Sequence, residues 1–265
     1  MIGAARATIG FLGAALATVP LATSQALVLR TGIADPAVLP RMWHRTLLRM
    51  LGVRVHVHGE LVRERPLLLA SNHISWTDIH VLGALADVAF VARADMARWP
   101  IVGALSRLQR TVFIERDRRA TAASQVSEIG ARLAAGDAVV FFAEGTTADG
   151  NRVLPFRSTL FGAAQTALRA GAGERVAVQP VAIAYTRLHG LPMGRQFRAR
   201  AAWIGEQELL PHALGLLSEG AIDVEVHFGE PVEFRAGGDR KAVARETEAR
   251  VRAMMARALR GAASG

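Results

Sequence analysis

The chain has 265 residues, of which 51% are hydrophobic and 21% are charged, and it contains no cysteine. This composition excludes a mainly disordered protein, a disulfide-stabilised scaffold, a thiolate zinc site and a cysteine nucleophile. The formal net charge is +9, and all but one of the 32 basic residues are arginine. Because arginine binds phosphate groups strongly and aromatic residues are scarce, we expect an anionic membrane surface as partner and no nucleic acid.

The N-terminal stretch is apolar. Residues 9–29 carry no charge and are long enough to cross a bilayer, although Pro20 and several polar residues interrupt the run. Three interpretations are open: a membrane anchor, a cleaved signal peptide, and a buried helical hairpin of a soluble protein. We favour the anchor.

A basic amphipathic helix is expected next, at residues 39–52. Arg41, Arg45 and Arg49 recur every four residues and so share one face, and Trp43 suits the headgroup level of a bilayer. An ordinary helix with solvated charges is the alternative. If the preceding run crosses the membrane, these arginines place the body of the protein in the cytoplasm. Residues 1–52 are therefore expected to form a membrane-anchoring segment.

From residue 53 onward, short β-like runs alternate with helical ones. Strands are expected at residues 53–58, 66–71, 88–92, 111–115, 138–143, 176–185 and 222–228, and helices at 121–136 and 239–260. Several of the strands are continuous apolar runs, which is typical of strands buried on both faces. The alternation predicts one α/β domain over residues 53–265, with a mostly parallel or mixed central sheet flanked by helices.

A polar cluster follows the expected strand at 66–71. It contains His73 and, five residues later, Asp78. Ligand sites in α/β sheets gather at the carboxyl ends of strands, and a histidine oriented by a carboxylate can act as a general base near neutral pH. Two alternatives remain open: Asp78 caps a helix while His73 is a core residue, or both belong to a metal site with His80.

Two further clusters follow expected strands. Glu144, Gly145, Thr146 and Thr147 come directly after the strand at 138–143. Cations that can bind an anion lie beyond them at Arg152 and Arg157 and after another strand at Arg116. Taken singly, the first cluster also fits an ordinary glycine-containing loop, and the arginines also fit ordinary solvated side chains.

Four short sequence segments, taken in order, resemble those of one known protein family. The segments NHISWTD, FIER, FAEGTT and VQPVAIAY lie between residues 72 and 185. In order and spacing they resemble the blocks of the glycerolipid acyltransferase family that includes the 1-acyl-sn-glycerol-3-phosphate acyltransferases. The resemblance implies transfer of an acyl group from acyl-CoA or acyl carrier protein to the hydroxyl of a lysolipid, with no metal or redox cofactor. It also implies a bacterial inner membrane enzyme with its catalytic domain on the cytoplasmic face.

The resemblance also assigns roles to residues. His73 matches the base, Asp78 its orienting acid and Arg116 the arginine that holds the acceptor's phosphate. Glu144 and Gly145 match the block that shapes the acceptor site, and Pro180 matches the proline of the last block.

One residue departs from the pattern. Thr147 stands where the family usually has an arginine, so a phosphate ligand is missing or is replaced by Arg152 or Arg157. A similar threonine-bearing block resembles the lyso-ornithine lipid acyltransferase branch. We therefore expect lysophosphatidate as acceptor, with lyso-ornithine lipid as a close second. Alternatives of other classes are a non-catalytic membrane-surface protein and a metal-dependent phosphohydrolase.

Overall fold

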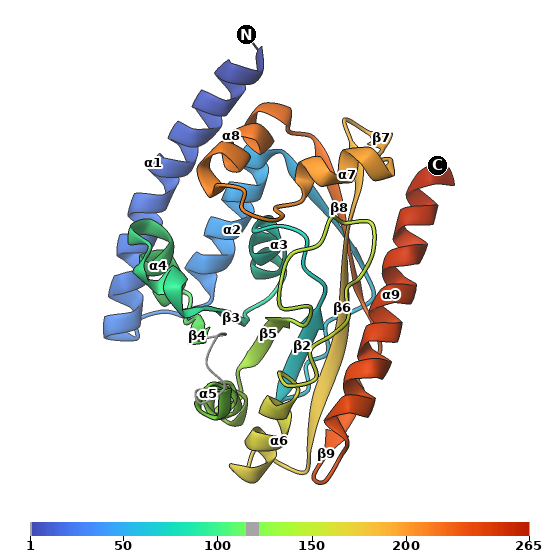
Figure 1. The fold of residues 1–265 in the computed structure, drawn as a ribbon. Helices are drawn as coiled ribbons and strands as arrows, with labels where there is room; N and C mark the ends of the chain where they lie inside the picture. Colours follow the sequence, from blue (N-terminus) through green and yellow to red (C-terminus); the bar gives the residue numbers. More distant parts are fainter. Residues whose placement is uncertain (1, 115–121, 265) are drawn as a thin grey trace.

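A mixed β-sheet forms the centre of the protein, as a computed structural model of residues 2–114 and 122–264 shows (Figure 1). Its main strands lie in the order β1-β8-β6-β2-β5-β3-β4, and two short strands pair with β6. The strands are β1 (Val53–His58), β2 (Leu67–Ser71), β3 (Ala89–Arg93), β4 (Val112–Ile114), β5 (Ala138–Phe142), β6 (Arg175–Leu188), β7 (Leu191–Pro192), β8 (Ile222–Phe228) and β9 (Val232–Arg235).

Parallel pairs make up the part of the sheet around β2. Strand β2 pairs in parallel with β5 and β6, and β3 pairs in parallel with β4 and β5. Strand β6 pairs antiparallel with β7, β8 and β9. Every residue of β2 and β5 is buried, as their continuous apolar runs predict. The expected α/β class with a mixed central sheet is confirmed.

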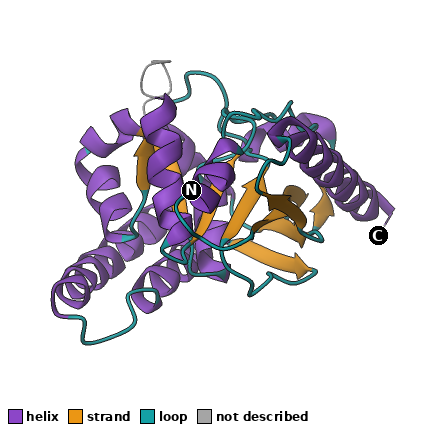
Figure 2. Ribbon diagram, turned by 90° about the horizontal axis from the view of Figure 1, so that it is seen from below, coloured by secondary structure: helices purple, strands orange, loops and turns teal. Residues whose placement is uncertain are grey.

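Helices cover both faces of the sheet (Figures 1 and 2). They are α1 (Ile2–Thr31), α2 (Val38–Leu51), α3 (Thr77–Leu85), α4 (Pro100–Leu108), α5 (Ala122–Ala134), α6 (Gly162–Arg169), α7 (Arg195–Ala201), α8 (Leu209–Glu219) and α9 (Arg240–Ser264), with a 3₁₀ turn η1 (Ala94–Arg98). Helix α9 lies along β6 on one side, whereas α2 and α3 pack together on the other side.

Strand β6 is longer than the sequence predicts and carries Pro180 in its middle. Up to Val178 it pairs with β9, and from Val181 onward it pairs with β8. The proline, which has no N–H to donate, lies at the change of partner, where its carbonyl accepts a hydrogen bond from the N–H of Gly229 at 2.9 Å. The change of partner therefore explains why a long inner strand tolerates a proline.

Helix α1 is docked along the domain. It contacts α2, α4 and α8, and its Arg6 donates from Nε to the carbonyl of Leu217 in α8 at 2.9 Å. Segment Gly3–Thr31 is long and apolar enough to cross a membrane, yet it lies against α2 and α8 (Figure 1). One side of α1 is thus used for packing inside the protein.

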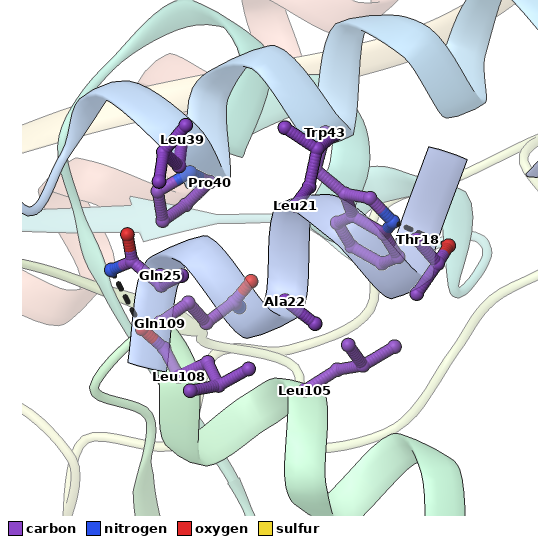
Figure 3. A pocket seen from close by; sticks show the side chains of 10 residues that line it. All are labelled: Thr18, Leu21, Ala22, Gln25, Leu39, Pro40, Trp43, Leu105, Leu108 and Gln109. Atoms are coloured by element: carbon purple, nitrogen blue, oxygen red, sulfur yellow. Dashed lines mark hydrogen bonds between the residues drawn. The ribbon is translucent and has the colours of Figure 1, made fainter. Parts of the chain in front are cut away.

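A small apolar cavity of about 30 Å³ lies between α1, α2 and α4 (Figure 3). Trp43 lines it and donates from its indole N–H to Thr18 at 2.9 Å, and Gln25 donates from Nε2 to the carbonyls of Pro36 and Leu108. The half-buried ring of Trp43 thus contacts Thr18 of α1 and His80 of α3, and its place at the headgroup level of a bilayer stays a prediction. The cavity is part of the docking of α1.

Candidate active site

The two polar loops meet because β2 and β5 are neighbours in parallel register. Ser71 lies opposite Phe142, and the N–H of Ala143 donates to the carbonyl of Ser71 at 2.9 Å. The chain leaves both strands at the same edge of the sheet, and the N–H of Ala148 then donates to the carbonyl of His73 at 2.8 Å. The structure thus brings the His73 loop and the Glu144 loop together.

His73 and Asp78 form a hydrogen-bonded pair. Nδ1 of His73 lies 2.8 Å from Oδ2 of Asp78, whose side chain is fully buried in the first turn of α3. The same oxygen accepts the N–H groups of Ile74 at 2.6 Å and Ser75 at 3.0 Å. Asp78 therefore holds the turn before α3 and the imidazole at once. The N-cap residue of α3, Trp76, makes no side-chain capping hydrogen bond, so the contacts of Asp78 favour the dyad over the helix-capping alternative.

The imidazole of His73 is fixed on a second side by an aromatic ring. It stacks on Phe142 with 3.8 Å between centroids and 11° between planes, and 15% of the side chain is exposed. Because an ionised carboxylate only accepts hydrogen bonds, Nδ1 carries the proton and Nε2 has the free lone pair. No hydrogen bond joins Nε2 to the part of the chain that the structure describes. The arrangement can accept a proton at a defined atom.

Glu144 ties the two loops to each other. Its side chain is 3% exposed; Oε2 accepts the N–H of His73 at 2.7 Å and Oε1 accepts the N–H of Leu154 at 2.6 Å. Burial raises the pKa of this carboxyl from 4.5 to about 7, against the opposing effect of the two N–H donors. Both oxygens are thus used inside the protein, and Glu144 shapes the site by holding the backbone of His73.

The remaining residues of this loop have different surroundings. Gly145 has φ +73°, and a Cβ there would lie 2.5 Å from Nε of Arg157, so this turn needs glycine. Thr146 is exposed. The hydroxyl of Thr147 donates to the carbonyl of Trp203. Thr147 therefore fastens the chain before α8.

The structure describes two of the three arginines that the sequence predicts as anion ligands. Arg152 and Arg157 are exposed and form no ion pair with any carboxylate in the described ranges. Arg157 lies against Gly145, next to Glu144. Arg116 lies outside the described residues.

Two groups at the site were not singled out from the sequence. The hydroxyl of Tyr185 in β6 donates to Oδ1 of Asp78 at 2.7 Å. The side chain of Asn72 pairs with the backbone N–H and C=O of Ile183, at 2.8 and 2.9 Å, and so joins the end of β2 to β6. A signal for Tyr185 exists in the sequence: it is the only tyrosine, placed at the end of an apolar strand, and a buried phenol needs a partner.

One group of side chains on β1 and β8 is close enough to share a metal ion within the described residues: His58, Glu225 and His227. The Nε2 atoms of the two histidines lie 3.4 and 3.1 Å from Oε2 of Glu225. Their rings are stacked, however, with only 11° between planes. A metal binds in the plane of an imidazole, and two nearly parallel planes do not meet at one ion, so this arrangement fits a carboxylate shared by two imidazoles.

Relatives of known name match most of the chain. It is 56% identical over 223 residues to the lyso-ornithine lipid O-acyltransferase of Brucella abortus, covering 84% of each chain, and 53% identical to that of Rhizobium meliloti, covering 84% of this chain and 76% of the relative. It is 31% identical to the 1-acyl-sn-glycerol-3-phosphate acyltransferase of Neisseria meningitidis, covering 80% of this chain and 78% of the relative.

A family model and a solved structure agree with these matches. The acyltransferase model matches residues 54–184. The crystal structure of the 1-acyl-sn-glycerophosphate acyltransferase PlsC from Thermotoga maritima has the same fold, with a TM-score of 0.62 and 22% identity over 95% of this chain and 97% of the other. The four blocks, the sheet and these relatives lead to one conclusion: the chain belongs to the acyltransferase family of PlsC type and is an acyltransferase of the glycerolipid class.

Proposed function

We propose that this protein is a lyso-ornithine lipid O-acyltransferase. The observation that carries the proposal is the identity of 56% and 53% to two enzymes of that name, against 31% to a 1-acyl-sn-glycerol-3-phosphate acyltransferase. The sequence blocks alone favour lysophosphatidate, because Arg116 matches the family's phosphate ligand. The relatives support the second acceptor of the sequence analysis better than the first.

Thr147 supports the same choice of acceptor. It replaces a cation by a hydroxyl that is already bonded to the carbonyl of Trp203, so this position offers no charge to a phosphate. An ornithine headgroup carries a carboxylate, which needs fewer cationic contacts than a phosphate monoester. We assign Arg152 or Arg157, both exposed near the Glu144 loop, to that anionic group.

In the proposed reaction, His73 is the general base and Asp78 orients it. Nε2 of His73 takes the proton of the acceptor hydroxyl, and the oxygen attacks the thioester carbonyl of acyl-CoA or acyl carrier protein. The tetrahedral intermediate then expels the thiolate, which receives the proton from Nε2. An ester bond forms, a thioester bond breaks, and His73 returns to its neutral state. Asp78 stabilises the imidazolium between the two proton transfers.

Helix α1 supports a membrane location for the reaction. It exposes large apolar side chains, as do α4 and α8, which contact it. They are Ile9, Leu12, Leu16, Val19, Ile101, Leu210 and Leu214. Helix α2 runs beside α1 and carries Arg41, Arg45 and Arg49. If the pair crossed the bilayer, each arginine near its centre would cost about 2.5–3.5 kcal/mol. We therefore propose that α1 lies in one leaflet, on the cytoplasmic face of a bacterial inner membrane.

The proposal is tested with the purified protein in detergent and a panel of acceptors. Release of thiol from an acyl thioester is followed with a thiol reagent, and the absence of cysteine from the chain makes the released thiol the sole signal. We expect rapid release with lyso-ornithine lipid and slow release with lysophosphatidate. Release with lysophosphatidate alone would contradict the proposed acceptor, and no acceptor-dependent release would contradict acyl transfer to either lipid.

A further inference from the structure

Tyr185 and His73 hold opposite oxygens of the same carboxylate. The phenol is 1% exposed and lies 2.7 Å from Oδ1 of Asp78, while Nδ1 of His73 lies 2.8 Å from Oδ2. Tyr185 comes from β6, more than 100 residues further along the chain, so this contact depends on the tertiary fold. Every atom of the carboxylate that can accept a hydrogen bond is thereby engaged.

The direction of each proton in this group follows from the chemistry. An ionised Asp78 only accepts, so the single proton of the phenol is donated to Oδ1. The hydroxyl of Thr77 lies 2.5 Å from the phenolic oxygen and must then donate to it. Burial and the negative charge of Asp78 raise the pKa of Tyr185 well above its ordinary value, so the phenol keeps its proton at neutral pH. The result is a directed chain from Thr77 through Tyr185 to Asp78.

A phenylalanine would fill the same space without the hydroxyl. Ile183 and Ala184, which precede Tyr185 in β6, are aliphatic and fully buried, so packing alone does not require an oxygen at this place. A buried hydroxyl costs free energy unless it is bonded. The hydrogen bond to Asp78 is therefore what the hydroxyl of Tyr185 adds over a phenylalanine at this position.

We propose that Tyr185 is a positioning residue of the acyl transfer: its hydroxyl, held by Thr77, fixes the Asp78 carboxylate so that Asp78 orients His73 without taking its proton. The inference rests on the proposed role of His73 as the base. Donors that stabilise the ionised carboxylate lower its proton affinity. Ile74 and Ser75 supply two such donors on Oδ2, and Tyr185 supplies the one on Oδ1.

The first test compares pH–rate profiles of wild type, Tyr185→Phe, Thr77→Val and Thr77→Ser. Loss of the phenol leaves Asp78 more basic and the imidazolium more stable, so the acid limb of kcat should move to higher pH by about 0.5–1 unit in Tyr185→Phe. We expect a smaller shift in Thr77→Val, none in Thr77→Ser, and KM for the acceptor within about twofold of wild type. A lower rate with an unmoved profile would overturn the positioning role.

The other titratable groups around the dyad are the same in all four proteins. They include Glu144, which follows β5, and Arg252 of α9, whose charge acts on Glu144. The comparison between variants therefore isolates the hydroxyls, and unfolding curves show whether each variant is folded.

A second test does not need activity. Because Tyr185 is the only tyrosine, the ultraviolet absorbance of tyrosinate reports this residue alone. In Asp78→Asn the negative charge is gone, so Tyr185 should ionise at lower pH than in wild type while the protein stays folded. Unchanged ionisation would overturn the contact. If wild type transfers no acyl group to any acceptor, the proposed function fails, whereas this titration still decides the Tyr185–Asp78 bond.

Discussion

At the scale of single residues, the proposed proton transfer depends on the imidazole of His73. Replacing it with alanine removes the base, and we expect turnover to fall by about 10²–10⁴, with vesicle binding unchanged. His58→Ala is the matched control, because that histidine lies on β1 beside Glu225 and apart from the dyad. Initial rates of thiol release measure both variants. Full activity of a folded His73→Ala protein would rule out this mechanism.

Glu144 makes stability depend on pH. Its pKa is 4.5 in the unfolded chain and about 7 in the folded one, so between these values the folded protein holds a proton that the unfolded chain has released. The free energy of unfolding should therefore fall as pH rises through this window, by at most about 3 kcal/mol from this group.

The check is a series of urea unfolding curves for wild type and Glu144→Gln. The amide does not titrate, so the difference in stability between the two proteins should change in favour of the variant from pH 4.5 to pH 7. Parallel pH dependences of the two proteins would show that Glu144 keeps an ordinary pKa.

At the scale of elements, local sequence patterns predict most of the strands but not which strands pair with one another. The apolar runs predict β2 and β5, and the polar residues after each run predict that the two following loops lie together. The length of β6 and the short β7 and β9 do not follow from local pattern, because they depend on pairing around Pro180. The same holds within the site: the pair of His73 and Asp78 is local, whereas the bond from Tyr185 requires the register of β6 beside β2.

The two sides of α1 should respond differently to substitution. Leu16 is 76% exposed, so Leu16→Glu should weaken binding to anionic vesicles about tenfold or more and leave the melting temperature unchanged. Gly10 faces α8, and a Cβ there would lie 2.7 Å from Cδ2 of Leu217; Gly10→Leu should lower the melting temperature. Vesicle sedimentation and thermal unfolding measure the two effects. Undiminished sedimentation of Leu16→Glu would place the membrane contact elsewhere.

At the scale of the whole molecule, a net charge of +9 should act together with the apolar face of α1. Attraction between exposed charges is screened beyond about 10 Å at 0.1 M salt, whereas apolar contact is not. Binding to anionic vesicles should therefore weaken as salt increases and level off above zero, and binding to neutral vesicles should depend little on salt. Complete release from anionic vesicles at high salt would show that charge alone holds the protein at the surface.

The acceptor choice is tested most directly by competition. Wild type, His73→Ala and Thr147→Arg each receive an equimolar mixture of lyso-ornithine lipid and lysophosphatidate with one acyl thioester, and mass spectrometry gives the ratio of the two products. We predict mainly ornithine lipid from wild type, neither product above background from His73→Ala, and a larger share of phosphatidic acid from Thr147→Arg, because the new cation binds the phosphate. Phosphatidic acid as the main product of the wild type would contradict the account.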